Sequence, residues 1–152
     1  MRRDIWTAAL GGSVAGLLDA IYATVLWGFV LGDGITGVWQ SVASGLLGLN
    51  AHTGGKSTAA LGLLLHFLIA FVMALVYVRA ARRLPVLIAQ PALMGALYGL
   101  VLFVVMNFIV IPLSAMGYHS PSLWGFWRAL LPHVVLVGPV IALIAAGRAR
   151  RP

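Results

Sequence analysis

Four long apolar runs constrain the fold of this chain more than any other feature. They cover residues 5–31, 59–78, 86–113 and 123–146. A helix that crosses the hydrocarbon core of a bilayer needs about 20 apolar residues, and each run reaches that length. The sequence therefore predicts an all-α integral membrane bundle of four transmembrane helices, forming a single transmembrane domain over residues 1–152.

The composition argues against a soluble fold. Hydrophobic residues make up 62% of the chain and charged residues only 9%, whereas a soluble domain carries about 25% charged residues. Too few charged side chains are present to cover a water-facing surface, so we expect no nucleic-acid partner despite a formal net charge of +7. The chain has no cysteine, which excludes disulfides, thiolate metal sites and thiol catalysis.

The first apolar run resembles a signal peptide, because Arg2 and Arg3 precede it. It is too long for the apolar region of such a peptide, it contains Asp19, and no convincing small-residue cleavage site stands near its end. We therefore interpret it as a retained span.

The basic residues indicate the orientation of the four spans. Eight of the ten precede the first run, separate the second from the third, or follow the fourth: Arg2, Arg3, Arg79, Arg82, Arg83, Arg148, Arg150 and Arg151. Basic residues accumulate on the cytoplasmic side of a membrane. We therefore expect both termini to lie in the cytoplasm.

The first outer connection has a helical pattern of its own. Apolar residues recur there at helical spacing, with polar residues on the other side: Ile35, Val38, Trp39, Val42 and Leu46 against Gln40, Ser41 and Ser44. No charged residue stands between Asp33 and Lys56. The pattern predicts a short helix that is interfacial or re-entrant.

Glycines and prolines in the spans predict how the helices pack and bend. A faint repeat matches Gly12, Gly16 and His66 in the first half with Gly95, Gly99 and His133 in the second. Small residues four positions apart let helix backbones approach closely in lipid, so we expect both glycine pairs to be packing sites.

Three prolines lie inside or near the spans. We expect kinks at Pro91, Pro132 and Pro139.

A few polar side chains lie at membrane depth, where each needs a partner and should face protein or water. They form the candidate transport or polar site: Asp19, His66, Asn107, Arg128 and His133. Asp19 shares a helical stripe with small residues, as does His66, which predicts that both face the bundle interior. His66 and His133 lie roughly 14–15 Å from the outer ends of their helices at a rise of 1.5 Å per residue. We therefore expect the two histidines to approach each other near the midplane.

Several segments together resemble a layout found in small four-span bacterial inner-membrane proteins, broadly of the YagU type. They are Ser44-Gly-Leu-Leu-Gly48, Leu65-His-Phe67, Met106-Asn107 with Pro112-Leu-Ser-Ala115, and Val137-Gly-Pro139 with Ala142. The resemblance covers nearly the whole chain and implies a bacterial inner-membrane location. It implies no reaction, so it assigns no functional residue.

Three functions are compatible with the polar site. The first is permeation of a proton, an ion or a small solute, with Asp19, His66 and His133 as an interior relay, in a homodimer because four spans are few for a transporter. The second is a membrane protein that binds haem b or a metal ion through His66 and His133. A bound metal would also need Asp19, because two histidines are too few ligands. The third is a structural or accessory subunit.

The sequence does not predict an enzyme. No nucleophile–base pair or carboxylate pair is visible among its residues.

Overall fold

In the computed structural model, the described residues are 2–117 and 122–150. Within these ranges every regular element is a helix. Four helical stretches are long and apolar enough to cross a membrane: Arg2–Val30, Gly55–Ala81, Pro91–Leu113 and Leu123–Ala149. The prediction of an all-helical chain with four long apolar helices is therefore confirmed. Arg151 and the part of the second outer connection that contains His119 lie outside the described residues.

Three of the four long stretches contain a π-helical segment. The first is α1 (Arg2–Ala23) followed by η1 (Thr24–Val30), and the second is α3 (Gly55–Ala81) alone. The third consists of α5 (Pro91–Val105), η3 (Met106–Val110) and α6 (Ile111–Leu113). The fourth consists of α7 (Leu123–Pro132), η4 (His133–Val137) and α8 (Gly138–Ala149). Shorter elements connect them: α2 (Gly34–Leu47) and the 3-10 turn η2 (Gly48–Thr53) before α3, and α4 (Val86–Ala89) before α5.

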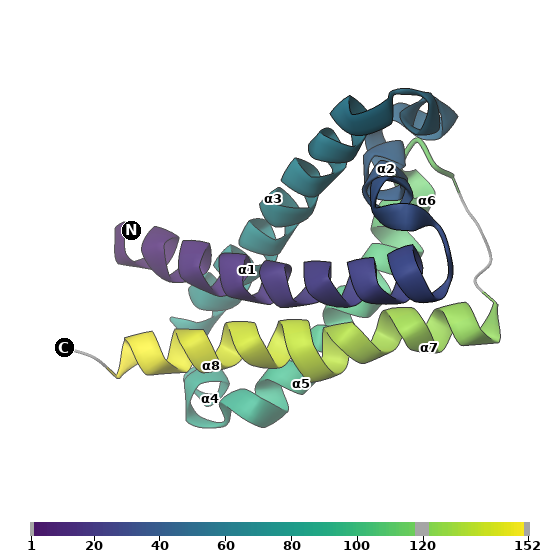
Figure 1. Cartoon of the computed structure of the whole chain (residues 1–152). Coiled ribbons are helices and arrows are strands. Elements are labelled where there is room, and N and C mark those ends of the chain that lie inside the picture. Colours follow the sequence, from purple (N-terminus) through teal and green to yellow (C-terminus); the bar gives the residue numbers. More distant parts are fainter. Residues whose placement is uncertain (1, 118–121, 151–152) are drawn as a thin grey trace.

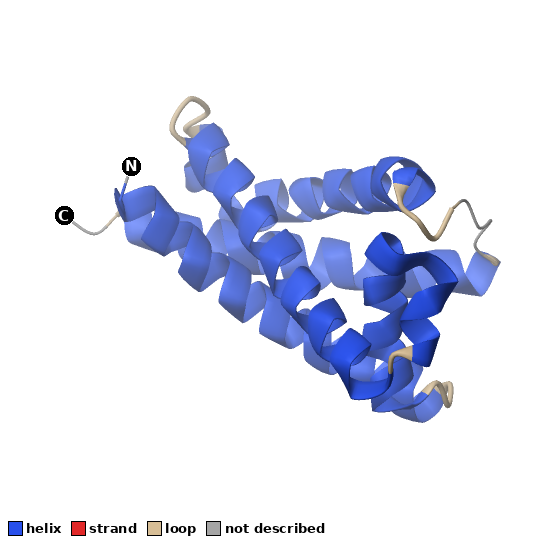
Figure 2. Ribbon diagram, turned by 90° about the horizontal axis from the view of Figure 1, so that it is seen from above, coloured by secondary structure: helices blue, strands red, loops and turns tan. Residues whose placement is uncertain are grey.

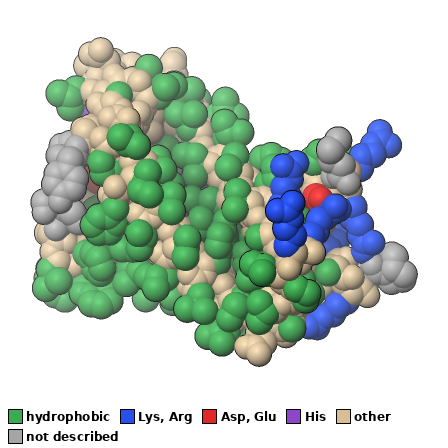
Figure 3. All heavy atoms as spheres, turned by 180° about the vertical axis from the view of Figure 1, so that it is seen from behind, with side chains coloured by type: hydrophobic (Ala, Val, Ile, Leu, Met, Phe, Trp, Pro, Cys, Tyr) green, Lys and Arg blue, Asp and Glu red, His purple; other side chains and the backbone are tan. Residues whose placement is uncertain are grey.

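The two chain ends lie side by side at one end of the bundle (Figures 1 and 2). α1 packs against both α3 and α8, and α5 packs against α8. The connection that carries α2 lies at the opposite end from the termini (Figure 1). Figure 3 shows Lys and Arg side chains gathered at the end that holds the termini, while the rest of the face drawn is mainly hydrophobic. This separation of charge matches the distribution of basic residues in the sequence.

The third apolar helix begins later than the sequence predicted. The run was expected to be continuous from residue 86, but Gln90, with φ −124° and ψ 63°, separates α4 from α5. Pro91 is the cause, because its ring disfavours the helical conformation for the residue before it. A proline is well suited to the first position of a helix, where its missing N–H would be unpaired anyway, and Pro91 begins α5.

The two glycine pairs pack as expected, each against the helix that carries a histidine of the repeat. A Cβ atom on Gly12 would lie 2.7 Å from the Cα atom of Phe71 in α3. A Cβ atom on Gly99 would lie 2.0 Å from the carbonyl oxygen of His133 in η4. No side chain larger than hydrogen fits at either position without moving the neighbouring backbone. The same unit, a glycine helix packed on a histidine helix, thus occurs in both halves.

The prolines of the last two long helices lie at junctions between helical segments. Both η3 and η4 end two residues before a proline, Pro112 in α6 and Pro139 in α8. A proline cannot donate the usual helical hydrogen bond, and its ring clashes with the carbonyl four residues earlier. The wider π turn accommodates this clash upstream of each proline. Pro132, also expected to mark a kink, is the last residue of α7.

α2 buries part of the apolar side that its pattern predicted, since Val38 and Trp39 are each 7% exposed, but it also buries two residues of the polar side. Gln40 and Ser44, assigned to the polar side, are 7% and 4% exposed, whereas Ile35 and Leu46, assigned to the apolar side, are 51% and 62% exposed. Gln40 is buried because its Nε2 atom donates to the carbonyl oxygen of Gly55 at 3.0 Å and so finds a partner at the start of α3. The apolar side chains left exposed are those a helix beside lipid would present.

Candidate functional site

One cavity between the helices collects a polar residue from each of the four long apolar stretches. Its volume is about 220 Å³, and its polar lining consists of Asp19 from α1, His66 from α3, Asn107 from η3 and His133 from η4. Both imidazoles lie close enough to Asp19 to interact with it electrostatically. Four of the five predicted site residues are therefore brought together, and the two histidines share the cavity as expected.

His66 is held by the backbone of the neighbouring helix. Its Nε2 atom lies 2.9 Å from the carbonyl oxygen of Gly16 in α1. A carbonyl oxygen only accepts hydrogen bonds, so Nε2 carries a proton and donates it. Because Gly16 has no side chain, α3 approaches α1 closely enough for this bond to form. The packing glycine is thus also the residue that orients the imidazole.

The remaining nitrogen of His66 faces a carboxylate. Its Nδ1 atom lies 4.0 Å from Oδ2 of Asp19, and the two side chains are 15% and 21% exposed. Since Nε2 already carries a proton, the Nδ1 atom of neutral His66 is unprotonated and faces Asp19 with its lone pair. An unprotonated ring nitrogen does not attract an ionised carboxylate. The contact is favourable when one more proton is present, either on Nδ1 or on Asp19. In both states the pair has no net charge, which lowers the cost of burying it.

His133 and Asn107 are anchored within their own helices. The Nδ1 atom of His133 lies 2.7 Å from the carbonyl oxygen of Ala129, and Nδ2 of Asn107 donates to Phe103 at 2.9 Å. Within the described residues this leaves Nε2 of His133 and Oδ1 of Asn107 without a hydrogen-bond partner. Both atoms are acceptors when His133 is neutral, and both belong to π-helical segments, which occur frequently at functional sites.

The rest of the cavity wall is mostly apolar, with Ile69, Met73, Met106 and Ile111 among its lining residues. α2 contributes to it from the side of the outer connection. Val42 lines the cavity, and the ring of Trp39 meets the His66 ring edge-on, with centroids 5.4 Å apart. A mostly apolar cavity with a few convergent polar groups is the usual form of a small-molecule site.

Arg128, the fifth predicted residue, does not line this cavity. Its guanidinium carbon lies 6.0 Å from the centroid of the Trp27 ring, and its carbonyl oxygen accepts a hydrogen bond from Tyr22 at 3.0 Å. A guanidinium over an indole ring is a stable position for a cation near a membrane interface. Through these two contacts Arg128 joins α7 to the first apolar helix.

Two tyrosines that the sequence reasoning left out lie on the arginine-rich side of the cavity. Tyr77 in α3 and Tyr98 in α5 have ring centroids 5.0 Å apart, and Tyr98 donates to the carbonyl oxygen of Met73 at 2.7 Å. Tyr77 is only 1% exposed. The available signal was that each tyrosine is a polar group inside an apolar run, with its hydroxyl in need of a partner.

The geometry also bears on whether the histidines could hold a cofactor. Small-molecule pockets have volumes of about 300–1,000 Å³, and a haem needs space at the upper part of that range. This cavity, at about 220 Å³, is smaller. Moreover, Nε2 of His66 is already bonded to Gly16. Among the described residues, no three His, Cys, Asp or Glu side chains are grouped so that they could hold a metal ion.

Comparisons add no relative to this picture, because no protein family, curated protein or solved structure matches the chain. The fold and the cavity therefore define the class of protein. Its described residues form an all-helical chain with four helices able to cross a membrane and a polar cluster between them.

Proposed function

We propose that the four apolar helices span a bacterial inner membrane, with both termini in the cytoplasm. Support comes from the exposed surface, where large hydrophobic side chains predominate along the helices, and from the arginines gathered at the end with the termini (Figure 3). Basic residues are retained on the cytoplasmic side. The likeness to small four-span proteins of the YagU type adds the bacterial location. Reporters fused after residue 152 test the orientation, and activity of a periplasmic reporter would contradict it.

Within that membrane, we propose that the chain is a permeation protein. Its substrate is either the proton or a small solute that donates hydrogen bonds. The observation that carries this proposal is the cavity to which each of the four long stretches contributes one polar residue. Polar residues are costly inside a membrane, and those that face a shared cavity mark substrate or proton pathways. An engineered cavity of about 150 Å³ holds a molecule the size of benzene, so this one has room for a small solute.

The free hydrogen-bonding atoms favour a donor as the solute. Nε2 of His133 and Oδ1 of Asn107 are acceptors, because their other polar atoms already donate to carbonyl oxygens. An ammonium, an amide or a water molecule carrying a proton would satisfy them. A solute with only acceptors would leave them unpaired in an apolar cavity, which is costly.

Proton exchange would take place at the Asp19–His66 pair. At 4.0 Å the two atoms are too far apart for a direct hydrogen bond. A small movement of either side chain, or a bridging water, would let the shared proton pass between Nδ1 and Oδ2. Because the pair stays neutral in both states, this transfer creates no net charge in the membrane.

Permeation is favoured over haem or metal binding and over a purely structural subunit. Haem ligation would require a larger cavity and a free ring nitrogen in a suitable position on each histidine. A purely structural subunit would not require four helices to direct polar side chains to one cavity with apolar walls. We retain the homodimer as part of the proposal, since four spans provide few walls for a transport path.

The test uses purified protein in liposomes that contain a pH-sensitive dye. Proton flux is driven by a potassium gradient with valinomycin, and urea uptake serves as the assay for a neutral donor. Asp19→Asn and His66→Gln should lower the proton flux at least about tenfold, equivalent to about 1.4 kcal/mol, the scale of one hydrogen bond to a charged group.

Matched controls carry the same chemical changes at exposed positions of the outer connection, Asp33→Asn and His52→Gln. Both should conduct like the unchanged protein. Equal flux in all four variants, or no flux above empty liposomes, would overturn the proposal. Loss of folded protein in the cavity variants, with no flux in the unchanged protein, would instead support the structural subunit.

A further inference from the structure

A second pocket lies beside α2, at the end of the bundle opposite the termini. Its volume is about 250 Å³, and α2, the turn after it and the residues after α6 contribute to its lining, which includes Ser41, Ser44, Leu49, His52, Ala115 and Met116. We call this pocket the outer hollow. Val42, the next residue after Ser41, lines the polar cavity instead. α2 therefore borders both the outer hollow and the polar cavity.

The contact between α2 and residues 111–116, which comprise α6 and the segment after it, separates the two spaces. We call this contact the seam. On one side of it, Val42 and Ile111 line the polar cavity, and on the other side Ser41 and Ala115 line the outer hollow. α2 and α6 lie next to each other in Figure 1. Separation of α2 from α6 would thus connect the hollow with the cavity.

The seam is held weakly compared with the contact between α2 and α3. Between residues 34–47 and 111–116, all within the described part of the chain, a single hydrogen bond crosses it, from the backbone N–H of Ala115 to the carbonyl oxygen of Gly45 at 2.9 Å. By contrast, a Cβ atom on Gly62 in α3 would lie 2.7 Å from the carbonyl carbon of Trp39, and Gln40 donates to the start of α3. The seam can therefore open while α2 stays packed on α3.

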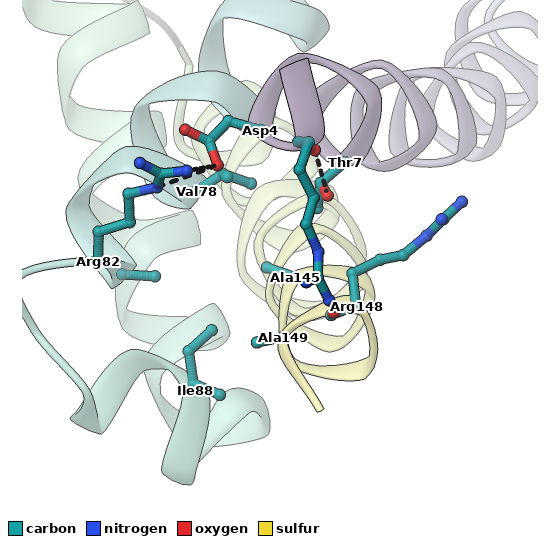
Figure 4. A pocket seen from close by; sticks show the side chains of 10 residues that line it. Asp4, Thr7, Val78, Arg82, Ile88, Ala145, Arg148 and Ala149 are labelled. Atoms are coloured by element: carbon teal, nitrogen blue, oxygen red, sulfur yellow. Dashed lines mark hydrogen bonds and ion pairs between the residues drawn. The ribbon is translucent and has the colours of Figure 1, made fainter. Parts of the chain in front are cut away.

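The opposite end of the bundle is held by more bonds. Arg82 donates twice to Oδ1 of Asp4, from Nε at 3.0 Å and from Nη2 at 2.6 Å, and Figure 4 shows these two side chains facing each other. Arg3 donates to the carbonyl oxygen of Arg148 at 2.6 Å. These bonds join the start of α1 to the ends of α3 and α8. Entry from this end would break more interactions than entry through the seam.

The outer hollow offers the same kind of hydrogen-bonding atoms as the polar cavity. The hydroxyl of Ser41 donates to the carbonyl oxygen of Gly37 at 3.0 Å, and that of Ser44 donates to the carbonyl oxygen of Ser41 at 2.7 Å. A hydroxyl that donates in this way keeps lone pairs that can accept. A solute that donates hydrogen bonds would therefore find acceptors in the hollow and again at Nε2 of His133.

We propose that the outer hollow is the entry site for the permeating solute, which reaches the polar cavity when the seam between α2 and α6 opens. This inference rests on the proposed permeation and specifies its route. Opening and closing of short elements over a site commonly controls access to it. η3, which carries Asn107, directly precedes α6. A movement of α6 therefore also moves one wall of the cavity.

The test locks the seam with a disulfide in the double variant Gly45→Cys with Ser114→Cys. A Cβ atom on Gly45 would lie 3.9 Å from the Cβ atom of Ser114, within the range of about 3.5–4.5 Å that a disulfide spans. The chain has no cysteine of its own, so no other disulfide competes. In liposomes, oxidation should lower the proton flux or urea uptake at least about tenfold, because a closed gate stops transport. Reduction should restore it.

The matched control is Asp33→Cys with Gly37→Cys. A Cβ atom on Gly37 would lie 3.6 Å from the Cβ atom of Asp33, so the same bond forms at the start of α2 without crossing the seam. Flux through this control should be equal when oxidised and when reduced, and a maleimide reagent counts the free thiols.

Two results would overturn the route. One is equal flux through the locked and the reduced seam, and the other is failure of the cysteines at positions 45 and 114 to pair under conditions that pair the control. Absence of flux in the unchanged protein would instead overturn the proposed function.

A second measurement remains informative if the locked variant does not fold. Ser41→Cys, modified from outside with a bulky, membrane-impermeant thiol reagent, should lose flux because the label fills the hollow. Thr36→Cys is the comparison, since Thr36 is also exposed on α2 but does not line the hollow. It should conduct normally after the same modification. Equal flux in the two labelled variants would refute the hollow as the entry site.

Discussion

Replacing Gly99 by alanine tests the packing that holds the polar site together. A Cβ atom at this position would lie 2.0 Å from the carbonyl oxygen of His133 and 2.8 Å from the Cα atom of Val134. These are backbone atoms, so no side-chain rotation relieves the clash. Ordinary contact begins at 3.4 Å, and α5 and η4 must separate locally by about 1.4 Å. Overpacking of this kind costs about 1–3 kcal/mol.

The helix itself gains from alanine, by up to about 1 kcal/mol. We therefore expect a net loss of up to about 2 kcal/mol, which lowers the melting temperature by as much as roughly 4–8 °C in a protein of this size. Thermal unfolding in detergent, followed by circular dichroism, measures the change. Because His133 moves with its backbone, proton flux in liposomes should also fall.

Gly11→Ala is the matched control. The nearest atom to its Cβ would be that of Ala74 at 3.7 Å, an ordinary contact, and Gly11 lies in α1, one residue from the packing glycine Gly12. We expect its melting temperature to equal or slightly exceed that of the unchanged protein. If Gly99→Ala were as stable as Gly11→Ala, the close approach of α5 to η4 would not exist and the packing argument would fail.

Three further changes probe other parts of the fold, each by its melting temperature in detergent. Asp4→Asn should cost about 1 kcal/mol at low salt and less in 1 M salt, because its partner Arg82 is 58% exposed and screening weakens such pairs; an unchanged cost at high salt would contradict this. Trp39→Ala removes a side chain that is 7% exposed and should cost about 3 kcal/mol or more, so a negligible change would mean that α2 does not pack on α3. Tyr98→Phe loses the hydrogen bond to Met73 and should cost about 1 kcal/mol; an unchanged melting temperature would mean that this bond adds nothing to stability.

Much of the site was predictable because membrane depth makes polar side chains conspicuous. Asp19 and His66 were identified from the small residues that share their helical stripes, and the structure brings them to one cavity. Arg128 was grouped with them on depth alone. Depth does not specify which way a long side chain points, and its guanidinium lies beside Trp27.

The missed features depend on contacts between residues distant in sequence. The burial of Gln40 on the polar side of α2 could not be predicted, because it depends on the carbonyl oxygen that Gly55 offers at the start of α3. The bond from His66 to Gly16 likewise joins two helices, and no periodicity within either helix indicates it. The start of α5 was predictable in principle, since Pro91 disfavours a helical Gln90.

The hydrogen bond of His66 leads to a last prediction that separates its anchoring role from its proton. In a glutamine, the amide nitrogen lies as far from the backbone as Nε2 of histidine, so His66→Gln can still donate to Gly16, although it cannot titrate. In an asparagine, the nitrogen reaches only as far as Nδ1, so His66→Asn loses the 2.9 Å bond.

We therefore expect His66→Gln to keep nearly the stability of the unchanged protein while losing the pH dependence of flux. His66→Asn should lose both, with a stability cost of about 1 kcal/mol for the missing bond. Melting temperatures, and flux measured over a range of pH, give the two readouts. Equal pH dependence in His66→Gln and the unchanged protein would mean that the exchanged proton does not reside on this imidazole. In that case Asp19 would have to exchange its proton with His133 or with water, because these are the remaining groups in the cavity that can accept it.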